Sequence, residues 1–229
     1  IPAIRQALSE GININITLIF AIENYRQVVE AYLSALEERS TKGQDISRIA
    51  SVASFFVSRV DVLVDTLLED KLKAVGESVE RQKLKALQGK IAIANARLAY
   101  QEFKRLFSEP RFAALMQRGA RVQRPLWAST SAKNPAYRDV LYAEELIGPD
   151  TVDTMPLKTI EGLRDHGRVR LSMEEHLREA QAQLAALEEA GIHYDEVTQQ
   201  LQDEGLQKFS DSFRTLFAGI DKKRKVLQR

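Results

Sequence analysis

Polar and charged side chains gather at four places along the sequence, each within or just behind a short run of β-forming residues. The runs span residues 12–20, 52–57, 126–130 and 151–155. The side chains of chemical interest are Asn15, Thr17, Ser54, Phe56, Arg59, Ser129 and Lys133. They include a planar guanidinium and an ammonium, which bind phosphate and other oxyanions through charge-assisted hydrogen bonds. The formal net charge is only +1, so any anion site in this chain must be local.

The first run has a two-sided pattern. Asn13, Asn15 and Thr17 share one face of a strand, and the intervening isoleucines and Leu18 share the other. An apolar face packed on helices, with a polar face turned to a barrel interior, produces this pattern. A solvated antiparallel edge strand produces it too. Gly11 precedes the run and is expected to end an earlier helix as a left-handed cap.

Arg59 follows the second run, in which Ser54 and Phe56 share a face. A guanidinium can bind a phosphate through two parallel hydrogen bonds, so Arg59 is a candidate anion ligand. The alternative is a salt bridge between Arg59 and the nearby Asp61. From the residues alone, the salt bridge is the preferred interpretation.

The third run leads into a hydroxyl-rich loop at residues 129–134. Asn134 suits a helix N-cap and Pro135 the first helical position, so a helix is expected over residues 136–147. Free backbone N–H groups and the helix dipole would favour an anion there, although such loops are common. Lys133 in this loop is a poor candidate for a Schiff base, because a reactive lysine needs a desolvated surrounding that lowers its pKa.

Long amphipathic stretches separate the β-rich runs. The expected helical segments are residues 22–39, one or two surface helices within 79–107, a helix behind Pro156, and a helical tail from Met173 broken at Gly191 and Gly205. Strands that alternate with helices, without hairpin signals, predict parallel βαβ units. We therefore expect an α/β single domain over residues 1–229. Its β/α units would occupy about 1–170, and its C-terminal helices 171–229.

Composition limits the classes of partner. The chain has 33 basic and 32 acidic residues, so no global field attracts nucleic acid or an anionic membrane. It has no cysteine, which excludes disulfides, thiolate metal ligands and a cysteine nucleophile. The histidines lack metal-ligand spacing, and the apolar stretches are too short to span a bilayer. We expect a soluble protein without a metal site, a nucleic-acid partner or a membrane partner.

Five segments together resemble transaldolases, most closely the branch found in mycobacteria and cyanobacteria. They are residues 11–20, 54–61, 126–130, 150–156 and the tail segment 202–209. The resemblance implies a (β/α)8 TIM barrel, of which this chain would supply the C-terminal four β/α units, strands five to eight. It also implies transfer of a dihydroxyacetone unit between sugar phosphates through a lysine Schiff base, in the pentose phosphate pathway. Such enzymes work in the cytoplasm and need no metal or organic cofactor.

The resemblance assigns catalytic roles to two residues of the first run. Asn15 matches a position that hydrogen-bonds the reacting sugar. Thr17 matches one that helps to hold the water used in proton transfer. Without the resemblance, both would be interpreted as satisfied polar groups inside a strand.

It assigns substrate binding to the other candidates. Ser54 and Arg59 match positions of the sixth strand and its loop, with Arg59 directed at the substrate phosphate, and Phe56 matches an aromatic wall of the pocket. Ser129 and Lys133 match the rest of the phosphate clamp. Lys133 stands where other branches of the family have an arginine. The positive charge is kept, but the planar guanidinium that can form two parallel hydrogen bonds is lost.

By the same resemblance, the Schiff-base lysine and two acidic residues would lie before Ile1. We therefore expect the chain alone to be inactive, and to self-associate or to need a missing N-terminal half. One alternative is a non-catalytic module that binds sugar phosphates. Another is a helical interaction protein, which would leave the strand motifs unexplained.

Overall fold

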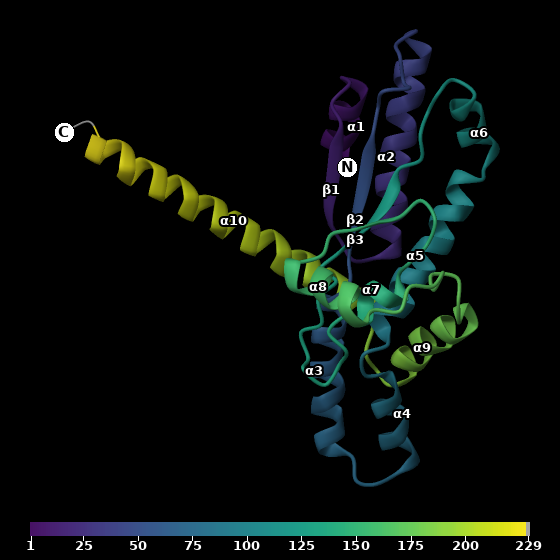
Figure 1. Ribbon diagram of the computed structural model, residues 1–229, viewed down its shortest axis with the longest axis vertical. Helices are drawn as coiled ribbons and strands as arrows, with labels where there is room; N and C mark the ends of the chain where they lie inside the picture. The colour runs from purple at the N-terminus through teal and green to yellow at the C-terminus, as the bar shows by residue number, and fades with distance from the viewer. Residues whose placement is uncertain (228–229) are drawn as a thin grey trace.

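Four parallel strands form the centre of the computed structural model, which describes residues 1–227 (Figure 1). The strands are β1 (Ile14–Ile19), β2 (Ser51–Phe56), β3 (Arg124–Ala128) and β4 (Val152–Asp153), and they pair in the order β1-β2-β3-β4. Each pair is parallel and follows sequence order. The predicted α/β class and its parallel strands are confirmed.

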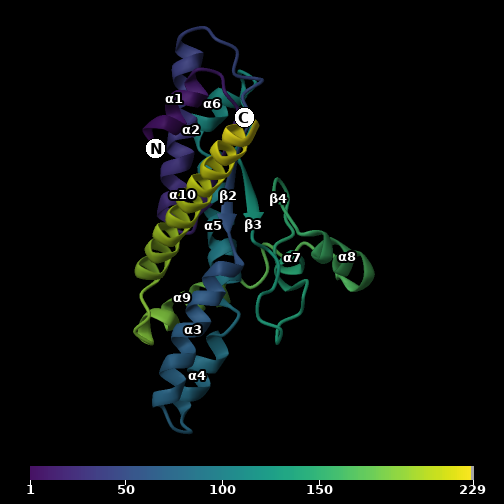
Figure 2. The ribbon, with the colours of Figure 1, turned by 90° about the vertical axis from the view of Figure 1, so that its left-hand side faces the viewer.

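Helices connect the strands and form the rest of the chain. Their bounds are α1 (Pro2–Ser9), α2 (Ile22–Thr41), α3 (Ser58–Ala74), α4 (Val79–Leu87), α5 (Ile91–Phe107), α6 (Pro110–Met116), α7 (Leu141–Glu145), α8 (Leu157–His166), α9 (Leu177–Glu189) and α10 (Tyr194–Leu227). Figure 2 shows α1 and α2 beside the strands, with β4 and α8 on the far side. None of these helices is long and apolar enough to cross a membrane.

One face of the sheet packs on the helices and forms the core. Phe55 and Trp127 are register partners on neighbouring strands, and their rings meet edge to face at 6.1 Å between centroids. Tyr25 of α2 packs on Phe55 from the helix layer at 6.5 Å. Both Phe55 and Trp127 are at most 1% exposed. Because side chains alternate along a strand, Ser54 and Phe56 point to the opposite face.

The N-terminal expectations are confirmed. α1 ends at Ser9, and Gly11 has a φ of +92°, in the left-handed region that glycine tolerates best. Its N–H donates to the Leu8 carbonyl oxygen at 3.0 Å. The chain therefore turns directly from α1 into β1.

The expectation of surface helices over residues 79–107 is wrong for the second part. The stretch breaks at Gly89, which has a φ of +68°. The helix that follows, α5, is largely buried, and its Asn95 is 0% exposed. Its small residues Ala92, Ala96 and Ala99 allow close approach of neighbouring elements. Residues 79–107 contain many charged residues, and for this reason the sequence analysis did not recognise α5 as a buried apolar helix.

The helix expected over residues 136–147 is present only in its second part, as α7 (Leu141–Glu145). The Asn134 side-chain oxygen accepts a hydrogen bond from the Ala136 N–H at 2.9 Å, and the Tyr137 N–H donates to the Asn134 carbonyl at 3.1 Å. These bonds make a local turn in place of a helix start. The helix begins only at Leu141. Asn134 therefore caps no helix, and the dipole argument for an anion at this loop does not hold.

The tail breaks at Gly191 as predicted, but Gly205 lies inside the continuous helix α10. A Cβ at position 205 would lie 3.0 Å from Cδ2 of Leu18. Glycine is present here because the helix passes close to the end of β1. A tertiary contact explains the residue, and no helix end is involved.

Candidate functional site

Ser54 and Asn15 form a direct pair across β1 and β2. The Ser54 hydroxyl donates to Oδ1 of Asn15 at 2.6 Å. Ser54 is only 2% exposed, whereas the Asn15 side chain reaches solvent on the open face of the sheet. The bond holds the amide in one orientation and leaves its NH2 group free to donate outward. Asn15, predicted to be catalytic, is thus oriented by Ser54, predicted to bind substrate.

Thr17 lies two residues beyond Asn15 and is also exposed. It lies within the span from Ile16 to Ile19 over which the β1–β2 register shifts, and the next residue, Leu18, has a φ of +62°. A left-handed conformation is costly for a branched aliphatic residue, and such strain recurs at functional sites. This irregularity changes the direction of the strand at the end of β1, close to Thr17.

Arg59 lies in the first turn of α3, the helix that follows β2, and its guanidinium lies over an aromatic ring. Its Cζ is 5.0 Å from the centroid of Phe56, whose ring packs against Phe20 at 5.4 Å. The proposed salt bridge with Asp61 is wrong, because Asp61 is buried and accepts hydrogen bonds from the Ala92 N–H and the Tyr142 hydroxyl. The half-buried Arg59 therefore contacts the Phe56 ring through its guanidinium.

Ser129 lies at the end of β3 in a left-handed conformation, with a φ of +59°. Its hydroxyl is 2.9 Å from the hydroxyl of Ser58, and its carbonyl accepts from the Ser58 N–H at 3.0 Å. Ser58 is the neighbour of Arg59 in the first turn of α3. The structure thus brings Ser129 next to the start of the helix that carries Arg59. Ser58 is a contact that the sequence analysis missed.

Lys133 lies on the loop that follows β3 and is exposed. Its Nζ donates to the Ser131 hydroxyl at 2.6 Å on its own exposed loop. It also lines a cavity of about 180 Å³ whose walls include the carboxylates of Asp61, Asp65 and Glu69. Among the contacts within residues 1–227, none joins Lys133 to Arg59.

Two buried aspartates line this cavity; the sequence analysis considered Asp61 only as a partner of Arg59 and did not single out Asp65. Asp65 accepts from the Tyr137 hydroxyl at 2.6 Å and from the Gly89 N–H at 3.0 Å. Asp61 accepts from Tyr142 at 2.9 Å and from Ala92 at 2.7 Å. Burial raises the pKa of Asp61 to about 7 and also raises the pKa of Asp65. Together they fasten the segment after β3 to α3 and to the start of α5.

A signal for these aspartates was present in the sequence. They stand four residues apart in α3 and share its apolar face with Val64 and Leu68. Carboxylates on the buried face of a helix are rare unless they have hydrogen-bond partners. The pattern could have marked them as a structural network.

Asp153 of β4 is a further carboxylate that the sequence analysis did not single out. It accepts from the Thr130 hydroxyl at 2.7 Å, which joins the ends of β3 and β4. Burial raises the pKa of Asp153 to about 6. Asp153 lies close to the turn at Ser129, so its carboxylate contributes to the electrostatic potential at this end of the sheet.

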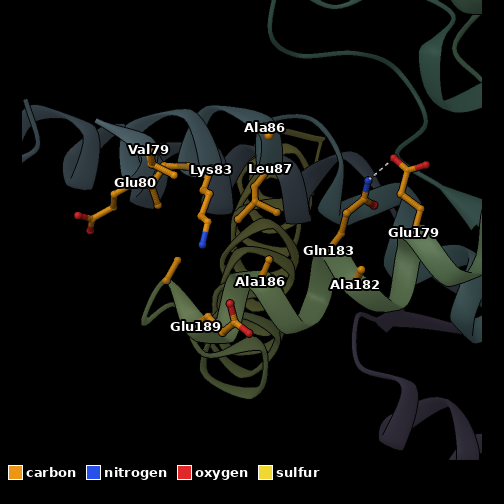
Figure 3. Close-up of a pocket in the computed structure, with 12 residues that line it drawn as sticks. Val79, Glu80, Lys83, Ala86, Leu87, Glu179, Ala182, Gln183, Ala186 and Glu189 are labelled. Atoms are coloured by element: carbon orange, nitrogen blue, oxygen red, sulfur yellow. Dashed lines mark hydrogen bonds between the residues drawn. The ribbon is translucent and has the colours of Figure 1, made fainter. Parts of the chain in front are cut away.

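A separate groove of about 630 Å³ lies between α4 and α9 (Figure 3). Its floor is apolar, with Leu87, Ala182 and Ala186, and its rim carries Glu80 and Lys83 among mixed charges. None of the sequence-predicted site residues lines it. No group of three or more His, Asp or Glu residues able to hold a metal ion occurs in the described part of the chain.

Comparison with known families gives the assignment. Residues 1–220 match the family model described as transaldolase/fructose-6-phosphate aldolase. The chain belongs to this family, in agreement with the resemblance read from its strand segments and with the parallel sheet described above.

Curated relatives support the same family. The chain is 46% identical over 229 residues to a transaldolase of Trichodesmium erythraeum, covering 99% of this chain and 60% of the relative. It is 48% identical over 221 residues to a transaldolase of Acidothermus cellulolyticus, covering 96% and 57%. Against a transaldolase of Thermobifida fusca the identity is 46%, with coverage of 94% and 57%. The chain thus spans somewhat less than two thirds of the length of these relatives.

Proposed function

We propose that this chain provides the substrate-binding strands of a transaldolase, its sheet being strands five to eight of an eight-stranded barrel. The observation that carries the proposal is the placement of the Asn15–Ser54 pair and of Arg59 on Phe56 along the same two parallel strands. Barrel enzymes bind substrates at the carboxyl ends of their strands and in the following loops, where Arg59 and Ser129 lie. The family and the names of the relatives support it.

The reaction would move a dihydroxyacetone unit from sedoheptulose 7-phosphate to glyceraldehyde 3-phosphate, giving erythrose 4-phosphate and fructose 6-phosphate. Breaking the carbon–carbon bond near a ketose carbonyl requires an electron sink, and a lysine iminium provides one. In the described residues the strands contain no lysine, and Lys133 lies on an exposed polar loop. We therefore assign the Schiff-base lysine to a strand outside residues 1–229.

The residues of this chain have separate roles in the proposal. The amide of Asn15, oriented by Ser54, donates to a sugar hydroxyl, and the Thr17 hydroxyl holds the water that carries the proton. Arg59 and Ser129 bind the terminal phosphate beside the Phe56 ring. Lys133 would join them only after its ammonium leaves the Ser131 hydroxyl.

A chimera tests the proposal. Residues 1–229 are joined to the part of the Trichodesmium erythraeum transaldolase that they do not cover, and borohydride is added with fructose 6-phosphate. The chimera is expected to turn over and to trap an adduct on a lysine outside residues 1–229. The 229-residue chain alone should trap none. A Thr17→Val chimera should bind the sugar phosphate and turn over far more slowly.

Two outcomes would overturn the proposal. An adduct on Lys133, located by peptide mass mapping, would make the loop after β3 the reactive centre. A folded chimera that binds fructose 6-phosphate but forms no adduct would favour the non-catalytic binding module.

A further inference from the structure

The loop between β3 and α7 is attached to α3 at two points. At its start, the Ser129 carbonyl oxygen accepts a hydrogen bond from the Ser58 N–H at 3.0 Å. Further along the loop, the Tyr137 hydroxyl donates to Oδ2 of Asp65 at 2.6 Å. Ser58 and Asp65 are about 10 Å apart along the axis of α3. Lys133 lies four residues from each of the two attached loop residues, so both attachments limit where its ammonium can reach.

The attachment at Tyr137 depends on its ring as well as on its hydroxyl. A Cβ at Gly89 would lie 2.7 Å from Cζ of Tyr137, so the ring lies directly against the glycine backbone. The Gly89 N–H donates to Oδ1 of Asp65 at 3.0 Å, and one carboxylate therefore binds both the tyrosine and the turn before α5. Burial, followed by the hydrogen bond to Asp65, raises the pKa of Tyr137, so its hydroxyl stays protonated and remains a donor.

A short turn connects this attachment to Lys133. The Ala136 N–H donates to the side-chain oxygen of Asn134 at 2.9 Å, and the Tyr137 N–H donates to the Asn134 carbonyl at 3.1 Å. Asn134 follows Lys133 directly in the chain. Because the turn is compact, a displacement of Tyr137 is expected to displace Lys133 as well.

Carboxylates of α3 compete with a bound anion for the ammonium of Lys133. Asp61, Asp65 and Glu69 line the same cavity as Lys133. Both oxygens of Asp61 and both oxygens of Asp65 already accept a hydrogen bond from another group. Without the Tyr137 hydroxyl, one oxygen of Asp65 would lose its donor, and a charge-assisted bond would draw Lys133 into the cavity. The hydroxyl therefore keeps the ammonium away from this competing partner.

We propose that Tyr137 is a positioning residue for Lys133, and that its hydrogen bond to Asp65 keeps the ammonium available for a substrate phosphate at the end of β3. The inference rests on the proposed function, in which Lys133 joins Arg59 and Ser129 at that phosphate. It adds a residue that lies outside the phosphate contacts and sets phosphate affinity through the loop.

Tyr137→Phe tests the attachment, because it removes the hydroxyl and keeps the ring against Gly89. Tyr142→Phe is the matched control: its hydroxyl donates to Asp61 of the same helix at 2.9 Å, but Tyr142 belongs to α7 and lies beyond the loop. In the 229-residue chain, amide hydrogen exchange at residues 136 and 137 should become at least about tenfold faster in Tyr137→Phe and stay unchanged in Tyr142→Phe. Unchanged exchange in Tyr137→Phe, or the same increase in both variants, would overturn the inference.

Titration calorimetry of the chimera measures the consequence for binding. Tyr137→Phe should bind fructose 6-phosphate about tenfold more weakly, which corresponds to the weaker end of the range for one charge-assisted hydrogen bond, and should bind fructose as before. Tyr142→Phe should leave both affinities unchanged. In a Lys133→Ala background, Tyr137→Phe should have no further effect, because Tyr137 acts through Lys133. Equal weakening for both sugars, or a further loss without Lys133, would show a general effect on the fold and contradict the positioning role.

The outcomes separate this inference from the proposed function. A chimera that binds fructose 6-phosphate without turnover, and whose Tyr137→Phe variant loses that binding selectively, supports the positioning role and counts against the enzyme assignment. An active chimera whose Tyr137→Phe variant binds fructose 6-phosphate as tightly as its parent overturns the positioning role alone.

Discussion

The hydroxyl of Ser54 donates a hydrogen bond to the side-chain oxygen of Asn15 at 2.6 Å, linking the middle of β2 to β1 across the open face of the sheet. The donor is buried and the acceptor is exposed. The pair therefore belongs both to the stability of the sheet and to the surface that would meet a substrate.

Removal of the Ser54 hydroxyl should cost about 0.5–1.5 kcal/mol of unfolding free energy, the usual net contribution of one hydrogen bond. Urea denaturation of the Ser54→Ala variant measures it. The exposed Ser212→Ala variant should stay within about 0.5 kcal/mol of the parent. If the two residues act as a pair, the Asn15→Ala and Ser54→Ala losses will not add. Full additivity would contradict a direct interaction.

Replacement of Arg59 by alanine in the chimera should selectively weaken the binding of phosphorylated sugars. A charge-assisted hydrogen bond contributes about 1.5–3 kcal/mol, or roughly ten- to a hundredfold in affinity. Titration calorimetry with fructose 6-phosphate and with fructose makes the comparison. Arg178→Ala, on the exposed side of α9, serves as the control. Equal weakening for both sugars would argue against a phosphate contact at Arg59.

Asp61 should make the fold less stable as pH rises. Burial raises its pKa to about 7, above the value of about 4 expected in the unfolded chain, so the folded state holds the proton more tightly. Between these two values the unfolding free energy should fall by up to about 1.4 kcal/mol per pH unit, and below pH 4 the contribution is fully present. The Asp61→Asn variant, followed by urea denaturation from pH 4 to 8, should lose this slope. A parallel pH profile for both proteins would contradict the assignment.

Gly89→Ala should destabilise the protein more than Gly43→Ala. The two glycines have nearly the same φ, +68° and +69°, so their backbone strain is matched. A Cβ at position 89 would lie 2.7 Å from Cζ of Tyr137, whereas position 43 has open space. Overpacking of this kind costs about 1–3 kcal/mol. Hydrogen exchange should also quicken around residue 137 in the Gly89 variant alone. Equal losses would mean that Tyr137 moves aside freely.

The sequence alone determined the chemistry of the strands and their parallel arrangement. The alternation of Asn15 and Thr17 with isoleucines, and the β-rich runs separated by helical stretches, follow from local steric and solvation preferences. Those preferences act within a few residues, so their effects can be predicted from the sequence alone. The same segments carried the resemblance that the family comparison bears out.

Only the tertiary structure decided how the loops and buried charges are arranged. The bond between Tyr137 and Asp65 joins residues 72 apart, and it accompanies a turn where local signals had predicted a helix. Gly205 looked like a helix end because its reason, the approach of Leu18, lies on a distant strand. Lys133 lines the same cavity as Asp61, Asp65 and Glu69 of α3, which no local pattern predicted. Packing partners far apart in sequence set these features, because close packing and the burial of charge depend on every element that surrounds a site.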